Sequence, residues 1–134
     1  MKTALLIVDA YLVGLAVVVA LVVYPAFRYV GTTEWPTYHR RHSAAIGVAV
    51  APAWLAQGIL SATWILTGPH RPFALVHGVF AALGVFVTIV GAVPQHNALS
   101  LAQSASRQRR LETWHWVRTV VWIGAVICAV LFTN

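Results

Sequence analysis

Four long apolar stretches make up most of the sequence, and their length is the feature that most limits the possible fold. They cover residues 4–27, 43–66, 73–93 and 111–132. A helix needs about 20 mainly apolar residues to cross the hydrocarbon core of a bilayer. The short period-two alternation of membrane β-strands is not seen. The sequence therefore predicts an all-α integral membrane protein, an antiparallel four-transmembrane-helix bundle that forms a single domain over residues 1–134.

The composition supports this interpretation and excludes two other classes of protein. Apolar residues make up 60% of the chain and charged residues only 9%, whereas soluble domains carry roughly 25% charged residues. An intrinsically disordered chain is excluded for the same reason. In a soluble protein the formal net charge of +6 would suggest nucleic acid as a partner. Here we expect membrane lipids and no nucleic acid.

The basic residues predict how the helices are oriented. Six of the nine lie in the connections 28–42 and 94–110: Arg28, Arg40, Arg41, Arg107, Arg109 and Arg110. The positive-inside rule places these connections in the cytoplasm and both termini on the outer side of the membrane. Lys2 before the first apolar stretch resembles the start of a signal peptide. That stretch exceeds the 7–15 apolar residues of a signal peptide, so we expect a membrane span.

The second helix is predicted to have two irregular features. A helix-start pattern around Glu34 indicates an N-terminal extension that runs along the membrane surface. Pro52 is expected to kink the helix near its middle. Four aromatic residues are expected at headgroup depth, as in an aromatic belt: Trp35, Tyr38, Trp114 and Trp116.

One face of the third span carries small and polar residues at helical spacing: His77, Ala81, Gly84, Thr88 and Gly91. Such a face lets membrane helices approach closely. We therefore expect it to pack against the other helices, with the Val, Leu, Ile and Phe side chains of the other faces in lipid.

A first group of polar residues is expected at the cytoplasmic side, where all four helices contribute to it: Tyr24, His39, His42, His96, Asn97, Glu112, His115 and Arg118. Ionisable groups inside a span are functional candidates. Arg118, one or two turns inside, requires a partner. The alternative is that Arg118 reaches the lipid headgroups while the histidines remain hydrated, and for His39 this alternative is the favoured interpretation.

A second polar cluster is expected near the outer side, where Asp9 and His77 lie at the same depth, with Gln57 and Ser61 approaching from the second span. A carboxylate opposite a histidine inside a membrane predicts an ion pair or a proton relay. The alternative is a structural pair that sets the helix register.

The acidic residues limit the metal chemistry. A di-iron bundle needs roughly four inward carboxylates, and the chain has only three acids. Haem remains open with axial ligands among His42, His96 and His115, as does a copper or zinc site that also includes His39. A protein without a cofactor is the main expectation.

Several short motifs resemble a known family: Tyr24-Pro25, Trp35-Pro36 with Tyr38-His39 and His42, Pro94-x-His96-x-x-Leu99, and Trp114-His115-Trp116-Val117-Arg118-Thr119 with Trp122. They are similar to those of small bacterial four-helix membrane proteins related to the anthrone-oxygenase-like family. The resemblance implies oxidation of anthrones to quinones by O₂ without a dedicated cofactor. His96 occupies a position that is Asn or His in the family, and His115 stands where many relatives carry Asn.

Such a reaction needs a base, a cation beside the developing oxyanion and an apolar pocket. We expect the base among His115, His96 and His42, and the cation to be Arg118. The lipophilic aromatic or quinol substrate is expected to contact Tyr24, Trp114, Trp122 and Asn97. The alternatives are a haem- or copper-binding membrane protein, and a non-catalytic accessory or transport subunit that uses Asp9 and His77. A homo-oligomer is compatible with so small an interior.

Overall fold

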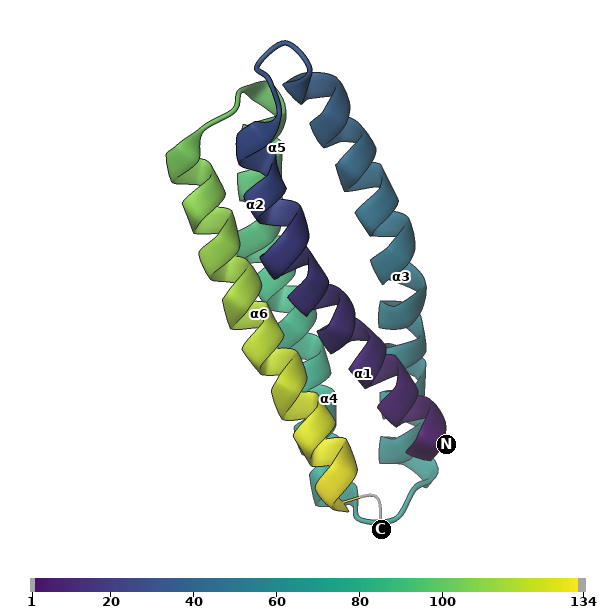
Figure 1. Cartoon of the computed structure of the whole chain (residues 1–134). Helices are drawn as coiled ribbons and strands as arrows, with labels where there is room; N and C mark the ends of the chain where they lie inside the picture. Colours follow the sequence, from purple (N-terminus) through teal and green to yellow (C-terminus); the bar gives the residue numbers. More distant parts are fainter. Residues whose placement is uncertain (1, 133–134) are drawn as a thin grey trace.

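The computed structural model describes residues 2–132, and the side chains of residues 3–131. It is all-helical within this range (Figure 1). Its elements are α1 (Lys2–Val18), η1 (Val19–Val23), α2 (Tyr24–Ala26), η2 (Phe27–Tyr29), α3 (Trp35–Thr67), α4 (Arg71–Val87), η3 (Thr88–Ala92), α5 (Val93–Leu101) and α6 (Ala105–Phe132).

Successive elements join into four continuous helical stretches that are long and apolar enough to cross a membrane: Thr3–Tyr29, Trp35–Thr67, Arg71–Leu101 and Ala105–Leu131. The first three contain the predicted stretches 4–27, 43–66 and 73–93, and the fourth covers 111–131 of the predicted 111–132, so the prediction of four long apolar helices is confirmed. The second helix does extend beyond its apolar stretch, because α3 already begins at Trp35 and runs unbroken past Pro52. That this extension runs along a membrane surface stays a prediction.

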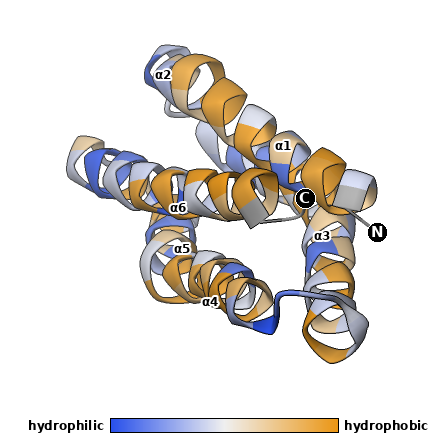
Figure 2. Ribbon diagram, turned by 90° about the horizontal axis from the view of Figure 1, so that it is seen from below, coloured by the Kyte–Doolittle hydropathy of each residue, from blue (hydrophilic) through white to orange (hydrophobic). Residues whose placement is uncertain are grey.

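The connections separate the two ends of the molecule (Figure 1). The first and last described residues lie at one end with the connection 68–70, and we call this the terminal end. The connections 30–34 and 102–104 lie at the opposite end, the loop end. Viewed along the bundle, α1, α6, α4 and α3 follow one another in a ring, and each contacts the next (Figure 2).

Two π-helical turns, η1 and η3, interrupt the regular helices, and each precedes a proline. The backbone N–H of Tyr24 bonds to the carbonyl of Val19, and that of Val93 to the carbonyl of Thr88. Proline lacks an N–H, and its ring clashes with the carbonyl four residues earlier. Pro25 and Pro94 each lie one residue beyond such a turn, so the wider turn accommodates this clash. Such π-bulges also change which side chains face the bundle interior.

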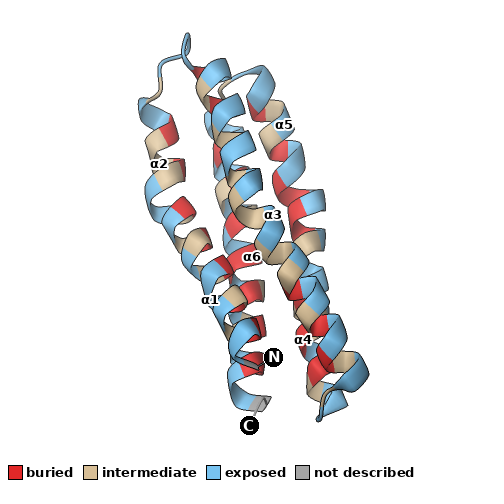
Figure 3. Cartoon of the chain, turned by 90° about the vertical axis from the view of Figure 1, so that its right-hand side faces the viewer, coloured by how far each residue is buried: buried red, intermediate tan, exposed pale blue. Residues whose placement is uncertain are grey.

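The predicted small-residue face is confirmed, because all five of its residues are buried: His77, Ala81 and Gly84 of α4, and Thr88 and Gly91 of η3. Buried residues lie where helices face one another and exposed residues lie outside (Figure 3). Gly84 and Gly91 have a steric reason to be glycine: a Cβ atom there would collide with the indole rings of Trp122 and Trp114 of α6. This absence of side chains sets the close approach of α4 and α6.

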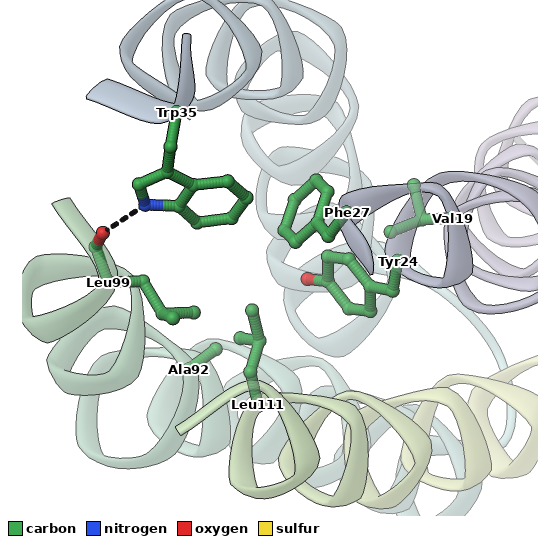
Figure 4. Packing of buried hydrophobic residues seen from close by; sticks show 7 residues of the cluster. All are labelled: Val19, Tyr24, Phe27, Trp35, Ala92, Leu99 and Leu111. Atoms are coloured by element: carbon green, nitrogen blue, oxygen red, sulfur yellow. Dashed lines mark hydrogen bonds between the residues drawn. The ribbon is translucent and has the colours of Figure 1, made fainter. Parts of the chain in front are cut away.

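The loop end is closed by an aromatic core in which Trp35, Phe27 and Tyr24 pack with Leu99 and Leu111 (Figure 4). The indole N–H of Trp35 donates a hydrogen bond of 2.7 Å to the carbonyl of Leu99. The Trp35 ring therefore packs inside the protein and does not face the surroundings as a residue of an aromatic belt would, whereas its position at headgroup depth stays a prediction. Its N–H finds a partner inside the protein, so the ring does not need the polar interface.

Candidate functional site

A cavity of about 340 Å³ lies near the loop end, between α3 and the stretch formed by η3 and α5. Its walls are mainly apolar, with Ile46, Val50 and Trp54 on the α3 side. Six polar residues also line it: Tyr24, Ser43, Thr88, His96, Asn97 and Arg118. An apolar hollow of this size with a few convergent polar groups is typical of small-molecule sites.

Arg118 projects from α6 to this cavity although its side chain is only 9% exposed. One terminal guanidinium nitrogen donates to Thr88 Oγ1 at 3.2 Å, and the other donates to His115 Nδ1 at 2.7 Å. The guanidinium also lies 4.9 Å from the centre of the Trp122 ring, a cation–π contact. Its Nε has no hydrogen-bond partner among the described residues.

The acidic side chains leave Arg118 without a counterion. Asp9 pairs with His77, and Glu112 lies 3.5 Å from Arg28. Glu34, the third acid, is exposed in the connection at the loop end. No carboxylate among residues 3–131 therefore pairs with Arg118. Its contacts with Thr88, His115 and Trp122 are all to neutral groups. A buried charge without a counterion is unfavourable, so the guanidinium is suited to contact an anion or an electron-rich oxygen in the cavity.

His115 is held in a single protonation state by its two neighbours. Its Nε2 lies 2.8 Å from the carbonyl oxygen of Ala16, which can only accept, so Nε2 carries the hydrogen. The lone pair on Nδ1 then accepts the hydrogen bond from Arg118. Both ring nitrogens are occupied, and His115 does not line the cavity. The ring orients Arg118 and has no free lone pair with which to act as a base.

Tyr24, His96 and His39 form a hydrogen-bonded chain that leads away from the cavity. The Tyr24 hydroxyl lies 3.4 Å from His96 Nε2, and His96 Nδ1 lies 3.2 Å from His39 Nε2. The far nitrogen of His39, Nδ1, is buried and has no described partner. His39 is 1% exposed, so the expectation of a hydrated His39 is wrong: helix α3 directs it inward, beneath Trp35.

His42 lies beside this chain but outside the cavity. Its ring centre is 6.0 Å from that of His96, and it lines a separate hollow between the start of α3 and Val23. Within residues 3–131, no group of three or more His, Cys, Asp or Glu side chains is arranged to hold a metal ion. The proposed set of His39, His42, His96 and His115 is divided, because His39 and His96 bond to each other and His115 bonds to Arg118.

The aromatic residues at the cavity differ in part from those the sequence suggested. Tyr24 and Asn97 line it as expected, but Trp114 and Trp122 do not. Those two rings fill the space above Gly91 and Gly84, between α4 and α6. Trp54 lines the cavity instead. Its place on the same helical face as Gly47 and Gly58 was the only sequence feature that pointed to it.

The second polar cluster contains all four predicted residues, close to the terminal end. His77 Nε2 lies 2.8 Å from Asp9 Oδ2, and Gln57 donates to Asp9 Oδ1 at 2.8 Å. The Ser61 hydroxyl donates to the Gln57 carbonyl at 2.6 Å, so its oxygen accepts from His77 Nδ1 at 3.1 Å. His77 and Asp9 then share one further proton. The pair has no net charge, whichever of the two holds that proton.

Comparison with known proteins adds no assignment: no family model, curated protein or solved structure matches the chain. The geometry of the two polar clusters is therefore the basis for a functional hypothesis.

Proposed function

We propose that the chain is a multi-pass protein of the bacterial cytoplasmic membrane, an antiparallel bundle with its loop end in the cytoplasm and both termini outside. Large apolar side chains are exposed on the outward faces of the helices, among them Ile7, Leu21, Leu55, Val79 and Ile127. In water such a surface would be unfavourable, whereas lipid accommodates it. The arginines around the loop end agree with the positive-inside rule.

We further propose that the cavity binds a lipophilic aromatic compound as its phenolate or enolate and oxidises it with O₂, as the resemblance to the anthrone-oxygenase-like family implies. The observation that carries this proposal is Arg118, a buried cation without a carboxylate partner that faces an apolar cavity. An aromatic oxyanion supplies both the missing negative charge and a flat apolar body. Trp54 and Ile46 provide the apolar wall.

The reaction balances without a cofactor. A base removes a proton from the benzylic methylene group of an anthrone, and the electron pair delocalises onto the ketone oxygen. Arg118 stabilises this oxyanion, as a preorganised cation does where charge develops. The carbanion form adds O₂ and a proton to give a hydroperoxide. Loss of water then leaves a second carbonyl, so one O₂ is consumed and one H₂O is released for each quinone formed.

His96 is the base in this scheme, because it is the one histidine among the described residues that lines the cavity. When the Tyr24 hydroxyl donates to His96 Nε2, the other ring nitrogen of His96 carries a hydrogen that points to His39. A proton accepted from substrate at Nε2 can therefore be matched by one passed to His39. The 3.4 Å separation at Tyr24 is long for a hydrogen bond and leaves Nε2 available to substrate.

The test uses purified protein in detergent with 1,8-dihydroxyanthrone and measures O₂ uptake and anthraquinone formation above the spontaneous rate. We expect one O₂ per anthraquinone, and a fall in kcat of about 100-fold in His96→Gln, the lower range for loss of a general base. His42→Gln is the matched control, because His42 is adjacent but outside the cavity. No turnover above the spontaneous rate, or equal loss in both variants, would contradict the proposal.

A further inference from the structure

A second hollow lies along the same seam between α3 and α4, on the side of Trp54 toward the terminal end. Its volume is about 280 Å³, and small or apolar residues dominate its lining, including Gly58, Ala62, Gly78 and Ala82. Trp54 lines both hollows. The second hollow, which we call the seam groove, therefore adjoins the first cavity at Trp54.

The order of the lining residues shows that the two hollows follow one another along the helices. On α3 the lining of the first cavity ends at Trp54, and that of the seam groove runs from Trp54 to Ile65. At 1.5 Å per residue this second stretch is about 16 Å long. On the opposite side, the groove is lined from Gly78 to Val85, and the first cavity begins at Thr88.

The seam groove offers little to a polar ligand. Gln57 and Ser61 line it, but Gln57 Nε2 donates to Asp9 and the Ser61 hydroxyl is shared by His77 and the Gln57 carbonyl. Apart from the indole N–H of Trp54, the remaining lining is apolar. Several of its small residues, Gly58, Ala62 and Ala82, are exposed on the outer surface of the bundle. A hydrocarbon chain can therefore enter sideways from lipid.

We infer that the ligand of the first cavity carries a hydrocarbon tail, which lies in the seam groove while the acidic aromatic ring contacts Arg118. The substrate class is then an alkyl- or prenyl-substituted hydroxyaromatic or quinol. This inference rests on the proposed function. Two observations support it. The two hollows adjoin at Trp54, and the lining changes from one that includes a cation and unpartnered polar atoms to one that is mainly apolar.

Three exposed glycines provide matched variants, because an added Cβ at each would have no heavy atom within 4 Å: Gly14, Gly47 and Gly58. Gly58 lines the seam groove, Gly47 lines the first cavity, and Gly14 on α1 lines neither. Leucine at each position suits a helix better than glycine. Gly58→Leu fills the groove, Gly47→Leu obstructs the ring site, and Gly14→Leu controls for the change of residue.

The experiment places the protein in lipid nanodiscs with 2-hydroxy-1,4-naphthoquinone, an acidic hydroxyquinone, in two forms. One form has no tail, and its binding is measured by calorimetry. The other carries a ten-carbon tail that ends in a diazirine, and the sites it labels on irradiation are mapped by mass spectrometry. We expect labelling within residues 58–65 and 78–85, prevented by an excess of the tail-less compound. Gly58→Leu should reduce this labelling about tenfold, because the leucine occupies the space of the tail, whereas Gly14→Leu should not change it.

The outcomes separate the two proposals. Tail-less quinone that binds the wild type but not Gly47→Leu, together with labels scattered over the outward faces of all four helices, would overturn the tail inference alone. Failure of the tail-less quinone to bind the wild type, or equal binding to Arg118→Met, would overturn the proposed function on which the inference rests.

Discussion

The two polar clusters of this bundle differ in how completely their hydrogen-bonding groups and charges are paired within the protein. Around Asp9 and His77, Gln57 and Ser61 complete a closed network with no net charge. Around Arg118 the cation contacts only neutral side chains, those of Thr88, His115, Tyr24 and Trp122, and its Nε lacks a partner among the described residues. Both clusters are buried, so exposure to water does not explain the difference.

Among the described residues, buried polar atoms without a hydrogen-bond partner occur at the cavity but not in the Asp9 cluster. Most buried polar groups in proteins have a partner, and each exception requires an explanation. None of the described atoms without a partner belongs to the Asp9 cluster, whereas Ser43, Trp54 and Arg118 at the cavity each contribute one. A closed network supports the fold, and an open one facing a cavity is suited to a ligand. We therefore expect the two clusters to respond in opposite ways to mutation.

The largest expected effect is on stability, at the closed cluster. Asp9→Ala removes one partner of a buried pair and leaves His77 and Gln57 facing an apolar interior. Such a loss destabilises a protein by about 3–5 kcal/mol. Unfolding in a titration with sodium dodecyl sulfate, followed by tryptophan fluorescence, should show a large decrease in the free energy of unfolding.

Asp9→Asn provides the control for this prediction. The amide retains an oxygen for Gln57 and occupies the same volume, so its loss of stability should be smaller. Binding of 2-hydroxy-1,4-naphthoquinone should stay at the wild-type level in whatever fraction of either variant is folded. If Asp9→Asn removes binding while the protein stays folded, the closed cluster also belongs to the ligand site and the comparison fails.

The second prediction is the converse, at the open cluster. Arg118→Met removes a buried cation that has no counterion, so stability without ligand should be unchanged or higher. Affinity for the hydroxyquinone anion should fall by about 10- to 150-fold, the change in Kd that corresponds to the loss of one hydrogen bond to a charged group. Calorimetry and the unfolding titration on the same sample measure both quantities.

Arg118→Lys distinguishes the positive charge from the shape of the guanidinium. Lysine keeps the charge but lacks the planar fork that donates to Thr88 and His115 together. We expect an affinity between those of the wild type and Arg118→Met. A strong loss of stability in Arg118→Met, without loss of binding, would mean that this cluster is also structural.

Much of the Asp9 cluster was predictable from the sequence, because it depends on depth alone. Asp9 and His77 lie at similar distances in sequence from the ends of their apolar stretches. Because a helix rises 1.5 Å per residue, the two side chains are expected at the same depth in the bundle. The small-residue face of α4 was predictable for a related reason. Its spacing from His77 to Gly84 follows a regular helix, and that part of α4 is regular.

The cavity was only partly predictable, because its residues depend on how each helix is rotated. The π-turns before Pro25 and Pro94 shift the faces of the first and third helices, and apolar patterning gives no sign of them. Two glutamines were overlooked for another reason. Gln103 and Gln108 donate to backbone carbonyls near the end of the first helix, those of Phe27 and Tyr24, and such pairings leave no periodic pattern.

The third prediction concerns His115, which acts on the ligand through Arg118. His115→Leu removes the acceptor of a 2.7 Å hydrogen bond and leaves the guanidinium less well oriented. We expect the affinity for the hydroxyquinone to fall about tenfold, close to the effect of one hydrogen bond to a charged group. His115→Gln can still accept from Arg118 and donate to Ala16, and should restore most of the affinity. Equal losses in both variants would indicate disturbed packing of α1 and α6.

The smallest expected effects come from removing two hydroxyl groups, one in each cluster. Because the two changes are similar in size, they compare the two clusters most directly. Thr88→Val keeps the shape of the side chain but removes an acceptor of Arg118, 3.2 Å away. Ser61→Ala removes the oxygen that accepts from His77 at 3.1 Å. A single neutral hydrogen bond contributes about 1 kcal/mol.

Thr88→Val should therefore weaken hydroxyquinone binding by about fivefold and change the free energy of unfolding little, because Arg118 already lacks full pairing. Ser61→Ala should lower the free energy of unfolding by about 1 kcal/mol and leave the affinity unchanged, because a closed network loses stability when any member is removed. If both variants alter both quantities equally, the clusters are coupled through Trp54 and the seam groove between them. The distinction between a structural and a ligand-binding cluster would then have to be abandoned.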